Sequence, residues 1–186
     1  VAVPGGRTEL ERMADVDAAL TVAEGAVFAA GYQGRIAAFA LGDGRLLWSR
    51  DISSYTGTAL FGRTLFATDA NGDAWALDAG TGRTLWKQDA LHARSLSTPT
   101  IQGNAIVVGD YAGYLHWLAV EDGHLMGRVR VEDPEYYFPV DVPEGMPESY
   151  QEDRGILAEP VALRDIVYAV DKRGAVNAFR VQPVED

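Results

Sequence analysis

Three histidines have the widest range of possible chemistry in this sequence: His92, His116 and His124. Zinc binding or nucleophilic catalysis would need histidines at a short ligand spacing, or a serine, a histidine and an aspartate gathered in one pocket. No two of these histidines lie at such a spacing. The chain also lacks cysteine, which excludes thiolate metal sites, cysteine nucleophiles and disulfides. We therefore interpret the histidines as structural or solvent-facing, and expect neither a metal site nor a catalytic residue.

Two aspartates near the start of the chain, Asp15 and Asp17, form a second candidate site. On an extended segment, residues two apart point their side chains to the same side. Both carboxylates could then meet an arginine, a lysine or exposed N–H groups of a partner, and Arg12 is close enough in sequence to orient one of them. The alternative is that both aspartates bond local backbone N–H groups in a loop. The two interpretations are compatible, because a locally bonded aspartate can fix a loop that docks.

The overall charge limits the classes of partner. The formal net charge is -11 and the sequence pI is about 4.6. Nucleic-acid binding needs clustered lysine and arginine to replace counterions, so the acidic balance argues against it. Adsorption to an anionic membrane surface is disfavoured for the same reason.

Internal repeats indicate the fold. Short apolar runs, each followed by a turn with glycine, recur along the chain, and the intervals between these glycines are 38, 41 and 61 residues (Gly34, Gly72, Gly113 and Gly174). A period near 40 with four short strands per unit is typical of β-propellers. No window shows the apolar spacing of helices, which excludes helical solenoids. The long last interval predicts an insertion of about twenty residues.

The sequence therefore predicts an all-β fold, a partial β-propeller of four-stranded antiparallel blades in which about four blades are present and the last is incomplete. A single domain spans residues 1–186, with blades at about 17–54, 55–97, 98–131 and 158–186. The repeated glycines are interpreted as hairpin turns and not as phosphate loops, because no helix follows them. Trp48 and Trp86 recur at one repeat position and are expected to pack as wedges between neighbouring blades.

The insertion, residues 132–157, is the segment least like a propeller. It contains four of the eight prolines and eight carboxylates against a single basic residue, Arg154. Such a segment cannot join a central strand, so we expect a solvated loop. Its aromatic residues leave two alternatives open, a protein contact or packing over a sheet edge (Tyr136, Tyr137, Phe138 and Tyr150).

Several stretches resemble known families. Residues 76–86 resemble the tryptophan-docking repeat of quinoprotein propellers. More specific stretches together closely resemble the C-terminal half of the BamB family of outer-membrane assembly lipoproteins: Met13–Asp17 after residues 9–12, and residues 91–99, 108–117 and 121–123. The resemblance covers nearly the whole chain except for residues from about 132 to 157.

The resemblance implies an eight-bladed propeller at the periplasmic face of the outer membrane, carried by an N-terminal lipid anchor that this chain does not contain. It implies a non-catalytic scaffold without a cofactor, which binds the POTRA region of BamA and assists the folding and insertion of outer-membrane proteins, with nascent outer-membrane proteins as possible further partners. The family's two contact aspartates correspond to Asp15 and Asp17, with Arg12 and Met13 beside them.

Two other functions stay open at this point. One is a propeller docking module with an unrelated partner. The other is a fragment of a quinone-dependent dehydrogenase, which would need a closed ring and a Ca²⁺ site of carboxylate and amide oxygens. A four-blade piece would also leave two faces uncovered, which predicts self-association, for example of two copies into an eight-bladed ring.

Overall fold

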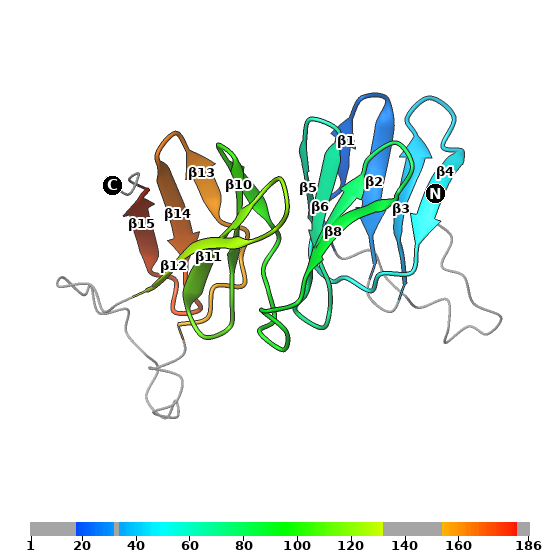
Figure 1. Ribbon diagram of the computed structural model, residues 1–186. Helices are drawn as coiled ribbons and strands as arrows, with labels where there is room; N and C mark the ends of the chain where they lie inside the picture. Colours follow the sequence, from blue (N-terminus) through cyan, green and yellow to red (C-terminus); the bar gives the residue numbers. More distant parts are fainter. Residues whose placement is uncertain (1–17, 32–33, 132–153, 182–186) are drawn as a thin grey trace.

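The computed structural model describes residues 18–31, 34–131 and 154–181, and the described chain consists of strands joined by turns and links. It has three four-stranded sheets and one three-stranded sheet (Figure 1). Their strands are β1 (Thr21–Ala23), β2 (Ala26–Ala30), β3 (Ile36–Ala40) and β4 (Leu46–Arg50); β5 (Thr58–Phe61), β6 (Thr64–Thr68), β7 (Ala74–Asp78) and β8 (Thr84–Gln88); β9 (Thr100–Gln102), β10 (Ala105–Gly109), β11 (Tyr114–Ala119) and β12 (Leu125–Arg130); β13 (Val161–Leu163), β14 (Ile166–Val170) and β15 (Val176–Arg180). A membrane-spanning helix is not found among the described residues.

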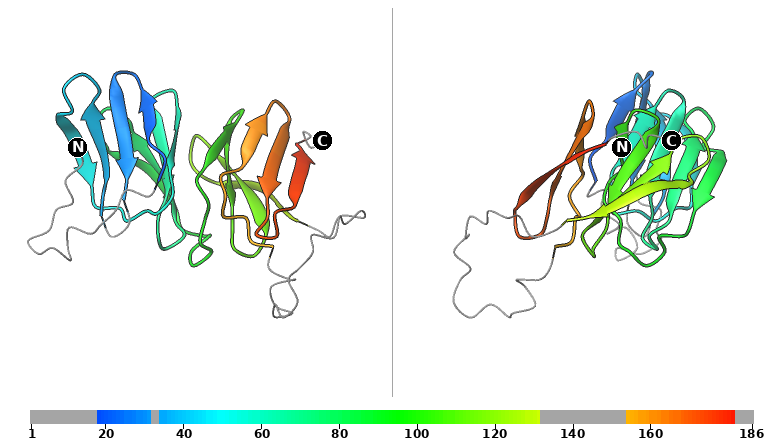
Figure 2. Two further views of the ribbon diagram at one scale, coloured as in Figure 1. Left: turned by 180° about the vertical axis from the view of Figure 1, so that it is seen from behind. Right: turned by 60° about the vertical axis from the view of Figure 1, so that its left-hand side comes forward.

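Each sheet is an antiparallel meander in which strands pair in sequence order. The first strands of successive sheets contact one another, β1 with β5, β5 with β9 and β9 with β13. The four sheets therefore stand side by side around their first strands, as blades of a propeller do (Figures 1 and 2). This arrangement confirms the predicted all-β propeller fold with about four blades, of which the fourth has three strands within the described residues.

The core lies between blades, because the side chains of each strand alternate between the two neighbouring blades. In the second blade, Leu65 and Leu77 pack toward the first blade, whereas Phe66 and Ala76 pack toward the third. All four side chains are completely buried. Small alanines beside large aromatic residues allow the sheets to approach closely. A third cluster, which includes Val107 and Val167, joins the third blade to the fourth.

The two recurring tryptophans are wedges between blades, as predicted. Nε1 of Trp48 donates to the carbonyl oxygen of Ala79 at 2.8 Å, and Nε1 of Trp86 donates to that of Val120 at 2.9 Å. A Cβ atom on Gly82 would lie 2.6 Å from the Trp48 ring, and a Cβ on Gly123 would lie 2.6 Å from the Trp86 ring. Each indole therefore covers a glycine turn of the next blade, where a larger residue has no room.

Two details differ from the expectations. The third blade was expected to begin at about residue 98, but its first strand, β9, begins at Thr100, directly after Pro99, which has no N–H to donate to a ladder. The end of the expected insertion belongs to the propeller, because Ile156 is completely buried between the third and fourth blades. Residues 132–153 lie outside the described part of the chain.

Candidate functional site

One end of the propeller concentrates the polar chemistry of the described residues. The β6–β7, β10–β11 and β14–β15 turns lie at this end, together with the segments that lead from one blade to the next (Figure 1). We call it the turn face. Antiparallel pairing puts the β3–β4, β7–β8 and β11–β12 turns at the opposite end.

Each of these three turns is built by a buried aspartate three residues before the turn glycine: Asp69, Asp110 and Asp171. In every case Oδ1 accepts hydrogen bonds from the backbone N–H groups two and four residues later, at 2.9–3.0 Å. The carboxylate thereby replaces solvent for two amides and fixes the loop. The glycine adopts a φ of 80–85°, which side chains of other residues strongly disfavour.

The incoming link of the next blade crosses directly over the first two of these turns, at Gly72 and Gly113. A Cβ atom on Gly72 would lie 2.8 Å from the carbonyl oxygen of Leu91, and one on Gly113 would lie 2.8 Å from that of Arg154. Backbone hydrogen bonds fasten the crossing, with the N–H of Ala93 donating to the carbonyl of Asn71 at 2.6 Å. The turn face is therefore a rigid surface, although it consists of loops.

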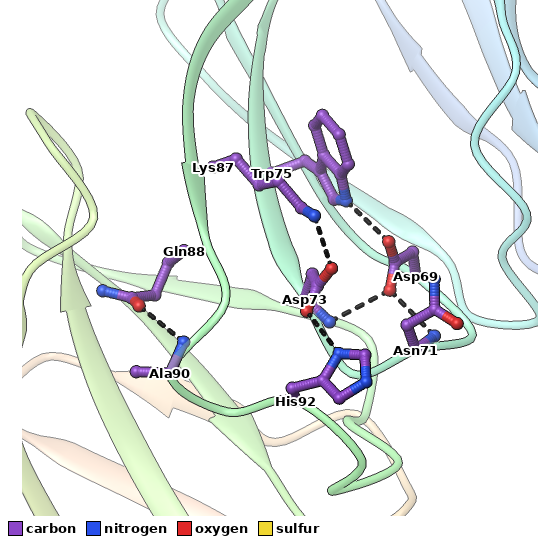
Figure 3. A network of polar contacts seen from close by, with 8 residues as sticks. All are labelled: Asp69, Asn71, Asp73, Trp75, Lys87, Gln88, Ala90 and His92. Carbon is purple, nitrogen blue, oxygen red and sulfur yellow. Dashed lines mark hydrogen bonds and ion pairs between the residues drawn. The ribbon is translucent and has the colours of Figure 1, made fainter.

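The second blade carries a network of charged groups on this face (Figure 3). Asp73 pairs with Nζ of Lys87 at 2.6 Å and with Nδ1 of His92 at 3.2 Å. Lys87 also lies 4.9 Å from the centre of the Trp75 ring, whose Nε1 donates to Oδ2 of Asp69 at 2.9 Å. Burial opposes ionisation of Asp73, but the hydrogen bonds from Lys87 and His92 outweigh it and lower the pKa of this carboxyl. The bond to Asp73 in turn raises the pKa of Lys87.

The third blade has a more deeply buried network. Oδ2 of Asp110 accepts from Nη1 of Arg94 at 2.7 Å and lies 2.9 Å from Nε2 of His116. The side chains of Asp110 and His116 are fully buried. Desolvation raises the pKa of Asp110. Hydrogen bonds from His116, from the backbone N–H of Tyr114 and from Arg94 lower this pKa by more than desolvation raises it, so the net pKa lies below the ordinary value.

The His116–Asp110 pair is closed off from solvent. Nε2 of His116 faces an ionised carboxylate, so it carries the hydrogen that it donates. Nδ1 is buried and has no hydrogen-bond partner among the described residues. No serine or threonine hydroxyl within residues 56–131 is bonded to His116 or to His92.

The structure places only some of the residues singled out from the sequence. His116 is buried beside Asp110, whereas His92 and His124 are exposed and pair with Asp73 and Asp122. No group of three or more metal-binding side chains gathers within residues 18–31, 34–131 and 154–181.

The four residues of the expected partner contact lie outside the described part of the chain: Arg12, Met13, Asp15 and Asp17.

The sequence reasoning missed the aspartates of the turn face, although a signal was present. Each aspartate precedes its turn glycine by three residues. Six residues after each aspartate stands a side chain that can form hydrogen bonds: Trp75, His116 and Asn177. Trp75 and His116 bond to Oδ2 of their aspartates. Reading the repeat by its polar positions as well as its glycines would have found this pattern.

Comparison with known proteins identifies relatives over most of the chain. The family model described as "Outer membrane protein assembly factor BamB" matches residues 1–88. A protein of that name from Alkalilimnicola ehrlichii is 45% identical over 130 residues, covering 70% of this chain and 34% of the relative. Its counterpart from Xanthomonas campestris pv. campestris is 35% identical over 181 residues, covering 97% of this chain and 40% of the relative. The chain thus spans between a third and two fifths of the length of these curated relatives.

Solved structures agree on the fold. The crystal structure of BamB from Moraxella catarrhalis superposes with a TM-score of 0.75 at 23% identity, covering 95% of this chain and 46% of that one. A quinohemoprotein alcohol dehydrogenase from Comamonas testosteroni superposes with a TM-score of 0.63 at 16% identity, covering 91% of this chain and 35% of that one. At these identities, both matches support the propeller fold alone.

Proposed function

We propose a function on the basis of the family to which this chain belongs, that of the outer membrane protein assembly factor BamB. Its proposed role is that of a non-catalytic scaffold at the periplasmic face of the outer membrane, lipid-anchored as part of the full-length protein. It binds the POTRA region of BamA, assists the folding and insertion of outer-membrane proteins, and contacts nascent chains. The observation that carries this proposal is the 35% identity over 97% of the chain to a relative of that name.

The geometry of the turn face supports a binding role. Asp73 and Asp110 each bind two cationic or histidine side chains on this face, so both of its histidines have carboxylate partners. The loops are held by buried aspartates and by glycines under crossing links, which gives a preformed surface for a protein partner. The proposed contact itself is made by Asp15 and Asp17, with Arg12 and Met13 beside them.

A pull-down of the POTRA region of BamA tests the contact. The variant Asp15→Ala/Asp17→Ala is expected to bind much less than the wild type, since two acceptors for the partner's cationic or N–H groups are lost. The matched control is Asp43→Ala/Glu121→Ala, which removes the same two charges from the exposed turns at the opposite end. Equal binding by the folded double variant would refute the site. Binding of another partner in place of BamA would favour the docking-module alternative, and absorbance of a bound quinone would favour the dehydrogenase alternative.

We also propose that isolated copies of the chain associate through the open faces of the outer blades. Pairing puts Val161, Leu163, Val170 and Val176 on the face of the fourth blade opposite to its core side chain Val167. Their exposed fractions are 41–69%. The open face of the first blade carries Val22, 57% exposed, and Leu47, 42% exposed. Joining the two kinds of face would bury both and close a ring of eight blades.

A further inference from the structure

Three guanidinium groups meet on one tyrosine of the turn face. The guanidinium carbons of Arg94, Arg128 and Arg130 lie 5.7, 5.5 and 5.7 Å from the centre of the Tyr114 ring. Strand pairing brings about this arrangement, because Tyr114 stands opposite Arg130, and Arg128 stands opposite His116. Arg94 enters from the link between the second and third blades. We call these four residues the arginine patch.

The patch has an excess of positive charge. Its bonded carboxylate is Asp110, which is fully buried, lies beneath Arg94 and is shared with His116. Arg128 and Arg130 are exposed and form no ion pair with any described carboxylate. Three cations thus converge in a chain whose net charge is -11.

Such convergence costs energy unless an anion occupies the patch. Guanidinium groups bind carboxylates through two parallel hydrogen bonds. The tyrosine ring supplies an apolar surface against which the guanidinium groups can stack. Tyrosine and arginine are also the residue types that dominate the centres of protein interfaces. A membrane surface fits less well, because the rest of this acidic chain is repelled by anionic lipid.

The spacing of the patch specifies the ligand further. Arg128 and Arg130 are two residues apart on β12, so their side chains leave the same side of the strand about 7 Å apart. Carboxylates at alternate positions of an extended peptide have the same separation. We propose that the arginine patch binds an extended acidic segment of a partner protein, with carboxylates at every second residue. This proposal does not depend on the partner being BamA.

The test is fluorescence anisotropy with the whole chain and a labelled peptide in which glutamate and threonine alternate. We expect saturable binding that weakens as salt screens the charges. Arg128→Gln/Arg130→Gln is expected to weaken binding about tenfold or more, because it removes two charge-assisted contacts. The control Arg45→Gln/Arg63→Gln removes the same charge from exposed arginines away from Tyr114 and is expected to bind like the wild type. Arg128 and Arg130 are exposed, so the variant should unfold at the wild-type urea midpoint.

Three results would overturn the proposal, and a fourth would refute its spacing argument. The first is the absence of saturable binding by the folded wild type. The second is an equal loss of affinity in both double variants, which would indicate a general charge effect. The third is binding to phosphatidylglycerol vesicles that depends on Arg128 and Arg130 while the peptide does not bind, which would assign the patch to lipid. A peptide of the same composition with its glutamates in one block should bind more weakly than the alternating one, and equal affinity would refute the spacing argument.

Discussion

The wedge between the first two blades gives a sharp prediction, because the chain contains its own control. Gly82 and Gly44 occupy the same turn position in successive blades, and both have a φ of 70°. A Cβ on Gly82 would lie 2.6 Å from the Trp48 ring, whereas a Cβ on Gly44 would meet no atom within 4 Å. The two Gly→Ala variants therefore share the backbone strain and differ in the collision with the indole.

The expected costs follow from these two contributions. A left-handed φ costs an alanine about 1–2 kcal/mol, and this applies to both variants. Forcing a methyl group into the packed indole adds about 1–3 kcal/mol for Gly82→Ala alone. With a urea slope of about 2 kcal/mol per molar, this addition lowers the midpoint of unfolding by about 0.5–1.5 M relative to Gly44→Ala.

Urea titrations followed by tryptophan fluorescence measure this difference. The protein is diluted until light scattering reports a monomer, so that no second copy covers Gly44 on the first blade. A second comparison uses the background Trp48→Leu, in which the smaller side chain leaves room for the methyl group. There the additional cost of Gly82→Ala should largely disappear, since neighbouring substitutions couple. Equal midpoints for Gly82→Ala and Gly44→Ala in the wild-type background would refute the wedge.

Two other predictions concern the buried aspartate and the open faces. The folded state lowers the pKa of Asp110, so ionised Asp110 stabilises the fold. This stabilisation is fully present above the ordinary pKa near 4 and is lost as the pH falls through the lower pKa of the folded state. Asp110→Asn should therefore lower the free energy of unfolding by about 3 kcal/mol at pH 7. In urea titrations, the difference in free energy of unfolding between this variant and the wild type should become smaller toward acid pH. A difference that stays constant with pH would contradict this. Val176→Glu should abolish the association of two copies in sedimentation equilibrium, because it puts a charge on the exposed face of the fourth blade. A wild type that stays monomeric at high concentration would contradict the open-face proposal.

The fold was predictable because its signals repeat. The turn glycines and the tryptophans recur in register, and each is required locally by a positive φ or by the packing of one blade on the next. Strand positions followed from the same periodicity. The first residue of a strand was less predictable than its position. At β9, Pro99 limits where the strand pairing can begin, and the pattern of apolar residues does not show this limit.

The candidate site was only partly predictable, for a physical reason. Asp110 and His116 are six residues apart and recur as a pattern, so the sequence contains that pair. The arginine patch depends on the pairing of β11 with β12 and on the path of a link from the preceding blade. Arg94 and Arg128 are far apart in sequence, and no local pattern places them on one ring. The contact assigned to Asp15 and Asp17 rests on family resemblance and stays a prediction.

Direct binding of the POTRA region of BamA to the whole chain tests the central claim. Isothermal titration of that region into the chain should give saturable binding at one site, because a preformed protein-binding surface is the proposed function. The measurement requires a chain whose β-sheet circular dichroism and cooperative urea transition show that it is folded. Saturable heat is the result expected here. A folded chain that releases no binding heat at any concentration reached would contradict the proposed role as a scaffold of outer-membrane protein assembly.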